Sequence, residues 1–300
     1  MSLSIQQHAD EVIVVLYQNR QLFRYVYRPQ TALEESPRPY FHPLATLQGD
    51  VVTDFRPADH RWHHGLAMTC AYLSSENFWG GPTYQRDQGY VWGNDHGTQA
   101  HQRWVALQQD PASINLIEEL HWLNHEQAVW LEEERTIRVP AASITPQSWT
   151  LALSFRLRNV SNQLLSFGSP TTQGRALAGY GGLFWRGPAS FLHGDILTST
   201  IEGPDAMSQP APWLAYRVSS PSAAPCTLVF MDDEHNPRYP TTWFVRSDQY
   251  PGASYSFMFA EPYLLPPGQV LDLHYQLIIA HAAWSRSQIA EAVSRNIPER

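Results

Sequence analysis

The sequence predicts an all-β protein, built as one large antiparallel β-sandwich that ends in a short helix. Two observations predict this class. Apolar residues make up 43% of the chain and aromatic residues 12%, a composition that can bury a sizeable core and that favours strands. In addition, a dozen or more short strand-like segments follow one another without helical patterns between them, which is typical of a large sandwich. We therefore expect residues 1–300 to form a single domain, with flexible ends at 1–10 and 296–300.

The strand pattern is clearest in three segments near the middle of the chain, at 114–122, 129–137 and 149–157. In each segment the residues alternate between two rows. A period of two places one row on a core and the other in water, as in half-buried antiparallel sheets. The row at 149–157 is apolar throughout, whereas the row at 129–137 includes Glu133 and Arg135.

Shorter patterns predict the remaining elements. An opening hairpin is expected from strands at 11–16 and 22–27. Two further strands are expected at 50–53 and 65–73, on either side of a polar turn at 56–64. A long loop rich in Gly, Trp, Tyr and Asn is expected at 77–96. Later strands, separated by Gly and Pro, are expected at 182–186, 213–218, 226–231, 242–246, 254–261 and 270–280. One C-terminal helix follows, with Ser285 or Ser287 as its cap.

The charge and residue usage exclude several classes of function. The net charge of −8 argues against a nucleic-acid partner and against a polybasic membrane contact. All 20 basic residues are arginine, so mechanisms that need a lysine, such as Schiff-base chemistry or a P-loop, are excluded. No apolar stretch is long enough to span a membrane and no signal peptide opens the chain, so we expect a cytoplasmic protein. Cys70 and Cys226 lie in apolar runs and are expected to be buried free thiols.

A histidine-rich segment at 59–65 is the strongest candidate for chemistry. It contains His60, His63 and His64 beside Asp59, and His42 precedes it. Histidine transfers protons near neutral pH and is the commonest metal ligand. If the chain is extended here, His63 and His64 point to opposite faces, so at most one of them joins His60 in a pocket.

Three interpretations of this segment stay open. The histidines could carry out acid–base catalysis or bind a substrate, they could hold a divalent metal ion, or they could cap turns by bonding to the backbone. The spacing matches no standard zinc signature. The metal ligands in the second interpretation would be His60, His63 and His42.

A glycine-rich segment at 174–186 is the second candidate. Tyr180 and Trp185 offer flat apolar faces, and Arg175 and Arg186 offer forked donors, a combination that suits a sugar. The alternative is a strand entered through a glycine-rich turn, with Trp185 in the core.

A third candidate lies in the C-terminal part of the chain. Residues 232–236 form a polar turn, and Glu261 is a carboxylate in an otherwise apolar strand. If buried, Glu261 could be a general base with a raised pKa. Alternatively, it pairs with an arginine such as Arg246 or lies exposed at the end of the strand.

The chain also resembles a family of bacterial proteins that is labelled PmoA-like, or methane oxygenase PmoA. The resemblance extends from about residue 10 to about residue 283, and it implies a link to carbohydrate metabolism. The segments that carry it are 38–44, 59–66, 76–80, 178–186 and 243–246.

The ending at 257–279 is similar to the supersandwich of aldose-epimerase-like (galactose mutarotase-like) proteins. In those proteins a histidine acts as acid and a glutamate as base on a sugar ring. The resemblance implies that one of the three histidines at 60–64 and Glu261 take these roles here.

Three hypotheses about function follow. The first is a sugar-directed enzyme of isomerase, lyase or hydrolase type, with His60 or His64 as acid and Glu261 or Asp59 as base. The second is a non-catalytic carbohydrate-binding or sensing protein, and the third is a metal-dependent enzyme, including an oxygenase. We expect no organic cofactor, leave a divalent metal open, and expect a carbohydrate ligand and a possible homodimer. The substrate-binding side chains would be His42, Trp79, Arg175, Tyr180, Trp185, Arg186 and Arg246.

Overall fold

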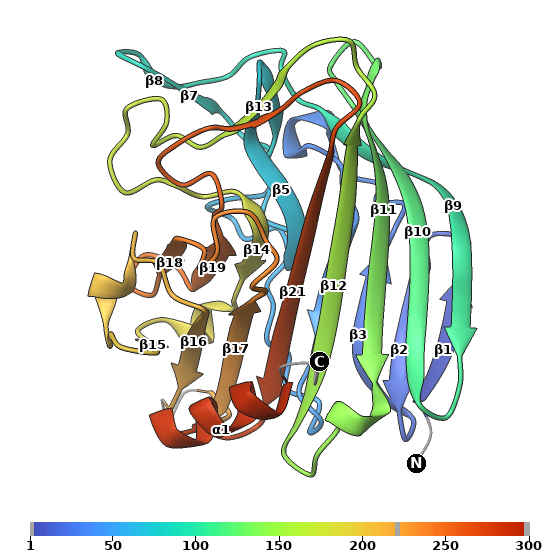
Figure 1. The fold of residues 1–300 in the computed structure, drawn as a ribbon. Coiled ribbons are helices and arrows are strands. Elements are labelled where there is room, and N and C mark those ends of the chain that lie inside the picture. Colours follow the sequence, from blue (N-terminus) through green and yellow to red (C-terminus); the bar gives the residue numbers. More distant parts are fainter. Residues whose placement is uncertain (1–2, 220–222, 297–300) are drawn as a thin grey trace.

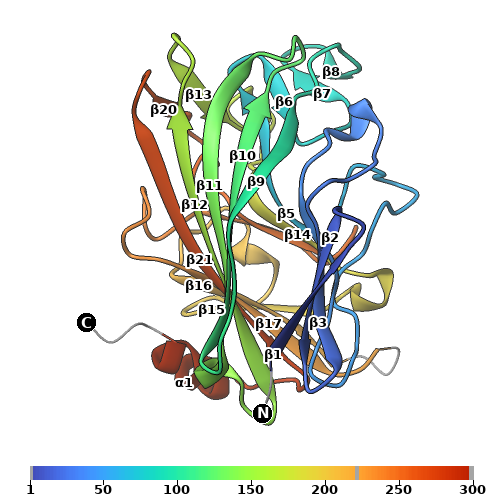
Figure 2. The same ribbon diagram turned by 90° about the vertical axis from the view of Figure 1, so that its right-hand side faces the viewer.

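Two large antiparallel sheets packed face to face confirm the predicted all-β class. The structure is a computed structural model and describes residues 3–219 and 223–296. Figure 1 shows the long strands of one sheet in front of the other sheet, and Figure 2 shows the two layers from the side. Of the ends expected to be flexible, at 1–10 and 296–300, residues 1–2 and 297–300 lie outside the described residues, and Asn296 is the last residue of the C-terminal helix.

The first sheet has eleven strands, eight of them in the path β1-β2-β3-β4-β5-β14-β19-β18; of the other three, β6 and β13 pair with β5, and β20 pairs with β13. The strands are β1 (Leu3–His8), β2 (Val12–Tyr17), β3 (Arg20–Val26), β4 (Tyr40–Leu44), β5 (Leu66–Leu73), β6 (Glu76–Phe78), β13 (Leu165–Gly168), β14 (Gly182–Arg186), β18 (Trp243–Arg246), β19 (Gly252–Tyr255) and β20 (Tyr263–Leu265). The second sheet has eight strands in the order β15-β16-β17-β21-β12-β11-β10-β9. These are β9 (Thr98–Gln109), β10 (Ser113–Leu123), β11 (Val129–Pro140), β12 (Ser148–Asn159), β15 (Asp195–Thr198), β16 (Trp213–Val218), β17 (Cys226–Asp232) and β21 (Val270–Ala280).

Helical structure is sparse. Helix α1 (Arg286–Asn296) begins after Ser285, whose carbonyl accepts the first helical hydrogen bond from Ile289, so one of the two expected caps is confirmed. Ile289 is buried, and the helix packs against the outer side of β17 at the lower end of Figure 1. No helix in residues 3–219 and 223–296 is long and apolar enough to cross a membrane. Single-turn 3-10 segments occur at Leu33–Glu35, Ala141–Ser143, Ala189–Phe191 and Pro204–Ala206.

The structure corrects four expected elements. The segment at 50–53, expected to be a strand, makes only an isolated bridge between Val51 and Ala45. Leu3–His8, which was expected to be a flexible end, is strand β1 and pairs with β2 over its full length. The expected loop at 77–96 contains most of β6 and the hairpin of β7 (Thr83–Gln85) and β8 (Gly89–Val91), because its polar and aromatic residues pair across a tight turn. The strand expected at 254–261 ends at Tyr255, and the chain then turns.

Alternation along the strands separates an inner from an outer face of the first sheet. In β14, Trp185 belongs to the core between the sheets, where its indole N–H donates to the carbonyl of Val52, while Phe184 and Arg186 face outward. Strand β18 follows the same rule, with Trp243 inside and Phe244 outside. The outer face therefore has its own aromatic cluster, and this cluster is the base of the candidate site.

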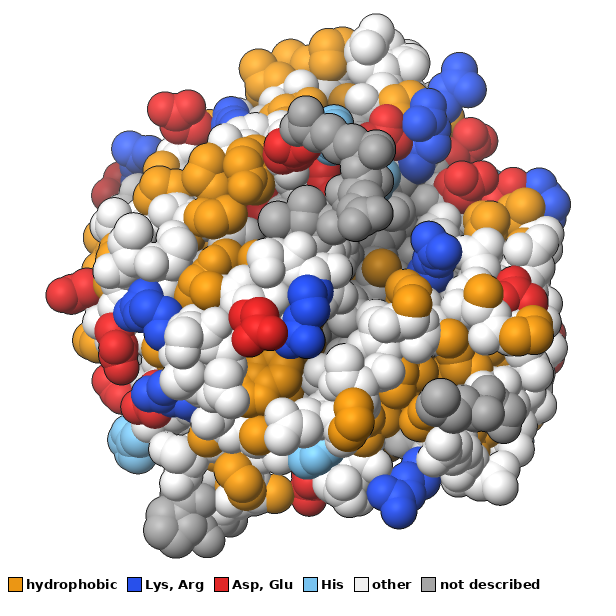
Figure 3. Space-filling view, turned by 60° about the horizontal axis from the view of Figure 1, so that its bottom comes forward, with side chains coloured by type: hydrophobic (Ala, Val, Ile, Leu, Met, Phe, Trp, Pro, Cys, Tyr) orange, Lys and Arg blue, Asp and Glu red, His pale blue; other side chains and the backbone are white. Residues whose placement is uncertain are grey.

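The two cysteines and the surface charges were also considered in the sequence analysis. Cys70 and Cys226 are buried and unpaired, as expected. On the face shown in Figure 3, acidic and basic side chains lie among one another, and the described residues drawn there form no continuous basic patch.

Candidate functional site

A cavity of about 350 Å³ lies over the outer face of β14 and β18. Long connections of the chain cover it, and they include the histidine-rich segment, the β7–β8 hairpin and the loop before β14. This size falls within the range of small-molecule sites. We call it the histidine pocket, and its walls are formed by Asp59, His60, Trp62, His63, Trp79, Pro82, Tyr90, Arg175, Tyr180, Arg246, Gln249 and Tyr250.

Tight turns place the histidine-rich segment at the pocket. The backbone N–H of His60 donates to the carbonyl of Pro57, and that of His63 donates to the carbonyl of His60, so the segment folds back on itself. Gly65, which has a φ of +53°, then turns the backbone into the start of β5. A Cβ at this position would lie 2.1 Å from the carbonyl oxygen of Phe41, so only glycine fits.

Asp59 and His60 form a hydrogen-bonded pair at the edge of the cavity. The Nδ1 atom of His60 lies 2.8 Å from a carboxylate oxygen of Asp59, and both side chains are partly exposed. Arg186 binds the same carboxylate from the inner side, with its Nη2 atom 3.1 and 3.2 Å from the two oxygens. Burial by itself raises the pKa of Asp59, but the hydrogen bond from His60 and the charge of Arg186 outweigh it and lower the pKa. Asp59 is therefore an ionised carboxylate that orients the imidazole of His60.

His63 lies directly beneath His60 and is neutral. The two rings stack with centroids 4.6 Å apart. Burial lowers the pKa of His63 well below its usual value, and the charges of His60 and Arg186 lower it further. Because Arg186 can only donate, its Nη1 atom fixes the Nδ1 atom of His63, 3.1 Å away, as an acceptor. The proton of His63 therefore sits on Nε2, a buried atom that has no hydrogen-bond partner among the described residues.

Aromatic rings and two further arginines complete the walls. The rings of Trp79 and Tyr180 lie 4.4 Å apart, and the Tyr180 hydroxyl lies 2.8 Å from that of Tyr90 on the β7–β8 hairpin. Arg175 donates to the Tyr90 hydroxyl, and Arg246 is placed at the end of β18. Such a surface offers flat apolar faces together with forked donors.

The structure brings seven of the predicted site residues into the pocket, and Arg186 lies directly behind it. The seven are Asp59, His60, His63, Trp79, Arg175, Tyr180 and Arg246. As expected for neighbours in an extended chain, His63 joins His60 while His64 turns to the other side.

Four predicted residues lie outside the pocket. Trp185 is in the main core because β14 alternates, so only Arg186 of that pair faces outward. His42 is half-buried beside Thr53, with its Nδ1 atom 3.0 Å from the hydroxyl oxygen. Glu261 is exposed, because the strand expected to hold it ends early, and in the described chain it makes no ion pair with Arg246. His64 is part of a separate buried network.

That network joins His64 to a residue that the sequence analysis did not single out. Glu35, in the turn before β4, accepts hydrogen bonds from His64 Nε2 at 3.0 Å and from Arg56 Nη2 at 2.6 Å. Burial raises the pKa of Glu35, but these two partners outweigh it and lower the pKa. Burial lowers the pKa of His64 to about 4, although the hydrogen bond to Glu35 opposes the change.

The stability of the fold should therefore fall on acidification. An unfolded histidine has a pKa near 6.5, so between about pH 6.5 and pH 4 the unfolded chain binds a proton that folded His64 excludes. The free energy of unfolding is expected to be unaffected by this group above pH 6.5 and to lose roughly 3 kcal/mol as the pH falls to 4. Urea unfolding at stepped pH measures the slope.

The variant His64→Gln should flatten this pH dependence, because glutamine keeps a donor for Glu35 but does not titrate. His193→Gln is the matched control, since His193 is an exposed histidine on a loop. An equal slope in His64→Gln and in the wild type would contradict the assignment.

Other residues of the pocket were missed because they come from segments with no regular pattern. Tyr90 lies on the β7–β8 hairpin, and Gln249 and Tyr250 lie on the turn after β18. The only signal for Tyr90 was the aromatic content of the long loop. Trp62 lies within the histidine segment, and it packs against Gly81, where a Cβ would approach the indole to 2.4 Å.

The three candidate metal ligands do not converge. His42 is bonded to Thr53, whereas His60 and His63 stack face to face with their Nδ1 atoms on Asp59 and Arg186. Among the residues that the structure describes, no group of three or more His, Cys, Asp or Glu side chains is placed to hold a metal ion.

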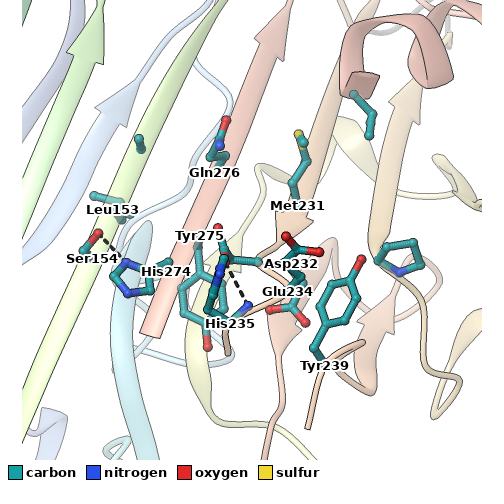
Figure 4. A pocket seen from close by; sticks show the side chains of 14 residues that line it. Leu153, Ser154, Met231, Asp232, Glu234, His235, Tyr239, His274, Tyr275 and Gln276 are labelled. Carbon is teal, nitrogen blue, oxygen red and sulfur yellow. Dashed lines mark hydrogen bonds and ion pairs between the residues drawn. The ribbon is translucent and has the colours of Figure 1, made fainter. Parts of the chain in front are cut away.

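A larger cavity, of about 770 Å³, lies on the outer face of the second sheet against β12, β17 and β21 (Figure 4). Its half-buried carboxylate, Asp232, accepts from Asn236 and from the backbone of Thr241, each at 2.7 Å, and partial burial raises the pKa of Asp232 to about 6. His274 is bonded to Ser154 at 2.9 Å, as Figure 4 shows. These groups satisfy one another, so the smaller pocket, which holds unpaired donors, is the better candidate.

Comparison with known proteins identifies a family. No curated protein matches the chain. Among solved structures, the galactosidase domain of alpha-galactosidase-sucrose kinase, AgaSK, is similar at a TM-score of 0.48 and 10% sequence identity. The match covers 96% of this chain and 43% of that one, so the chain spans less than half the length of that structure. The model of a family of unknown function matches residues 12–294, which is nearly the full chain, and the protein therefore belongs to this family, DUF6807.

Proposed function

We propose that the protein is an enzyme that acts on a sugar or sugar derivative by acid–base chemistry in the histidine pocket. One observation carries this proposal. The Asp59–His60 pair opens onto a cavity whose walls combine aromatic faces with hydrogen-bond donors. General acid–base catalysis needs a positioned proton-transfer group at the edge of a substrate site, and this pair meets that geometric requirement.

His60 is the proton-transfer group in this proposal. Its Nδ1 proton is directed at the Asp59 carboxylate, so in the neutral ring the Nε2 atom is left as the base. Once His60 has taken a proton, the ionised carboxylate of Asp59 stabilises the imidazolium, and the same group can return the proton to a leaving oxygen. Asp59 is the positioning residue, and Arg186 holds it in place from behind.

The remaining walls bind and orient the ligand. A sugar presents apolar C–H faces, for which Trp79 and Tyr180 offer closely packed rings. His63 is kept neutral, so it supports the ring of His60 by stacking without adding charge beside it. These contacts would hold the reacting carbon near His60.

Conversion of candidate substrates measured by NMR tests this function. A panel of sugars, sugar acids, keto-sugars and their glycosides is incubated with the wild type and with the double variant Asp59→Asn/His60→Gln. The wild type should convert at least one compound, and the double variant should lose that conversion while its circular dichroism spectrum shows that the fold is retained.

His235→Gln is the matched control. His235 is an exposed histidine whose Nδ1 atom lies 2.7 Å from Asp233, and it lies outside the histidine pocket. Equal conversion by the wild type and the double variant would refute the proposal. Binding of a sugar to the pocket without conversion of any compound would instead identify a binding or sensing protein.

A further inference from the structure

Two guanidinium groups in the wall of the histidine pocket have no anionic partner in the protein. Arg175 and Arg246 both line the cavity, and in the described part of the chain neither forms an ion pair with a carboxylate. The lining contains a single carboxylate, Asp59, and it is already bound by Arg186 and His60. Because Arg175 and Arg246 add two positive charges and the lining offers no further carboxylate, the pocket carries excess positive charge.

Neutral contacts hold both groups in place. Arg175 donates to the Tyr90 hydroxyl and lies over the Tyr90 ring, with its central carbon 4.9 Å from the ring centroid. Arg246 donates to the side chain of Gln249 and lies over the rings of Phe244 and Tyr250, at 5.4 and 5.9 Å. Aromatic faces and single hydrogen bonds orient a guanidinium without neutralising it, so further N–H groups stay available.

One of these two guanidinium groups also has a donor that no described residue satisfies. The Nε atom of Arg246 is buried and has no hydrogen-bond partner among the described residues. The positive fields of Arg246, Arg186 and Arg175 all act on Tyr250, where they oppose the rise of its pKa to about 12 that burial causes. Three guanidinium groups thus surround one ring of the pocket. Arg186 is already paired with Asp59, so a neutral sugar would leave the charges of Arg175 and Arg246 uncompensated, whereas a carboxylate or phosphate matches the geometry of these two groups.

We propose that the ligand of the histidine pocket is an anionic sugar, whose carboxylate or phosphate group is bound by Arg175 and Arg246 while its ring lies near His60. This inference rests on the proposed function, which it deepens by naming the class of substrate. Both candidate groups, a carboxylate and a phosphate, are compact oxyanions attached to a sugar, and the experiment below distinguishes between them.

The test uses pairs of sugars that differ only at one carbon. Glucuronate and galacturonate are compared with glucose and galactose, and with glucose 6-phosphate and galactose 6-phosphate, by calorimetry and by the ligand-induced shift of the melting temperature. At least one acid or phosphate should bind at least tenfold more tightly than its neutral partner, and added salt should reduce the difference. Preference for the uronate or for the phosphate identifies the source of the oxyanion.

Variants assign the effect to the two arginines. Arg175→Gln/Arg246→Gln should lose the preference for the anion. Arg246→Lys keeps the positive charge but loses the paired N–H donors of the guanidinium, so it should retain part of the preference for the anionic sugar. Because this variant keeps the charge, it also serves as a control for a general effect of the substitution on folding. Arg138→Gln, an exposed arginine on the second sheet, removes the same charge and should have no effect.

The outcomes separate this inference from the proposed function. An equal response to both members of every pair, including no response, would overturn the inference. Binding of acetate or inorganic phosphate as tightly as any sugar acid would also overturn it, because the sugar would then not be recognised. Arginine-dependent binding of an anionic sugar without conversion would support the inference and refute the catalytic function. Conversion of a neutral sugar with no preference for anions would support the catalytic function and overturn the inference that the ligand is anionic.

Discussion

Replacing His60 by glutamine is expected to lower the turnover of the sugar substrate by about 10²- to 10⁴-fold, the usual contribution of a general acid–base group. The loss follows from the Asp59–His60 geometry, because the imidazole is the proton carrier that Asp59 orients. Glutamine can still donate to the Asp59 carboxylate, but it cannot take up a proton. Since the side chain of His60 is 35% exposed, the free energy of unfolding should change by no more than roughly 0.5 kcal/mol.

Steady-state kinetics of single variants separates the proton carrier from the positioning residue. His60→Gln should reduce kcat with little change in KM, because the proton transfer is needed only in the transition state. Asp59→Asn should also reduce kcat, but by a smaller factor, since His60 is still present and has lost only its orientation and its counter-charge. Equal kcat values for His60→Gln and the wild type, on a substrate that binds in the pocket, would remove His60 from the mechanism.

The largest effect on stability is expected inside the sandwich, at Arg135. This side chain is 1% exposed in the core between the sheets. It binds the carboxylate of Glu133 at 2.6 and 3.0 Å and the side chains of Tyr25 and Gln99 at 3.0 Å each. Replacement by methionine keeps an apolar side chain but leaves Glu133 as an uncompensated buried charge. Breaking a buried pair in this way costs about 3–5 kcal/mol.

Urea unfolding of Arg135→Met and of Arg156→Met at the same pH measures this difference. Arg156 is the matched control, because it pairs with Asp272 at 3.0 Å on the exposed face of the second sheet. An exposed pair contributes at most about 1 kcal/mol. Removing Glu133 as well, in Arg135→Met/Glu133→Leu, should recover part of the lost stability. Similar losses for the two single variants would show that the buried network is not a stabilising unit.

Local sequence patterns predicted the fold class and most strands because the alternation of apolar and polar side chains along a strand depends only on neighbouring residues. The row at 149–157 became the buried face of β12, and even the charged members of the row at 129–137, Glu133 and Arg135, lie on the core side. The exceptions were short, mostly polar segments that carry no clear apolar alternation. Strand β1 forms by pairing with the adjacent β2, and β7 pairs with β8 across a tight turn inside the expected loop at 77–96.

The sequence also identified the centre of the candidate site, since Asp59, His60 and His63 are close together in the chain. It could not decide which of the more distant candidates join them. Trp185 and Arg186 are neighbours, yet the alternation of β14 places Trp185 in the core and Arg186 on the outer face, directly behind the pocket. Glu261 needed a strand that the structure ends at Tyr255.

By itself, the sequence determined the sandwich and the histidine-rich segment around which the pocket forms. Only the tertiary structure decided that Asp59 is shared between His60 and Arg186, that His64 belongs to Glu35, and that Tyr90 and Tyr250 complete the walls. The physical reason is the range of the interactions. Alternation and turn formation depend on adjacent residues, whereas the hydrogen bond between Arg186 and Asp59 joins residues 127 positions apart, which only the packing of loops on a finished sheet can bring together.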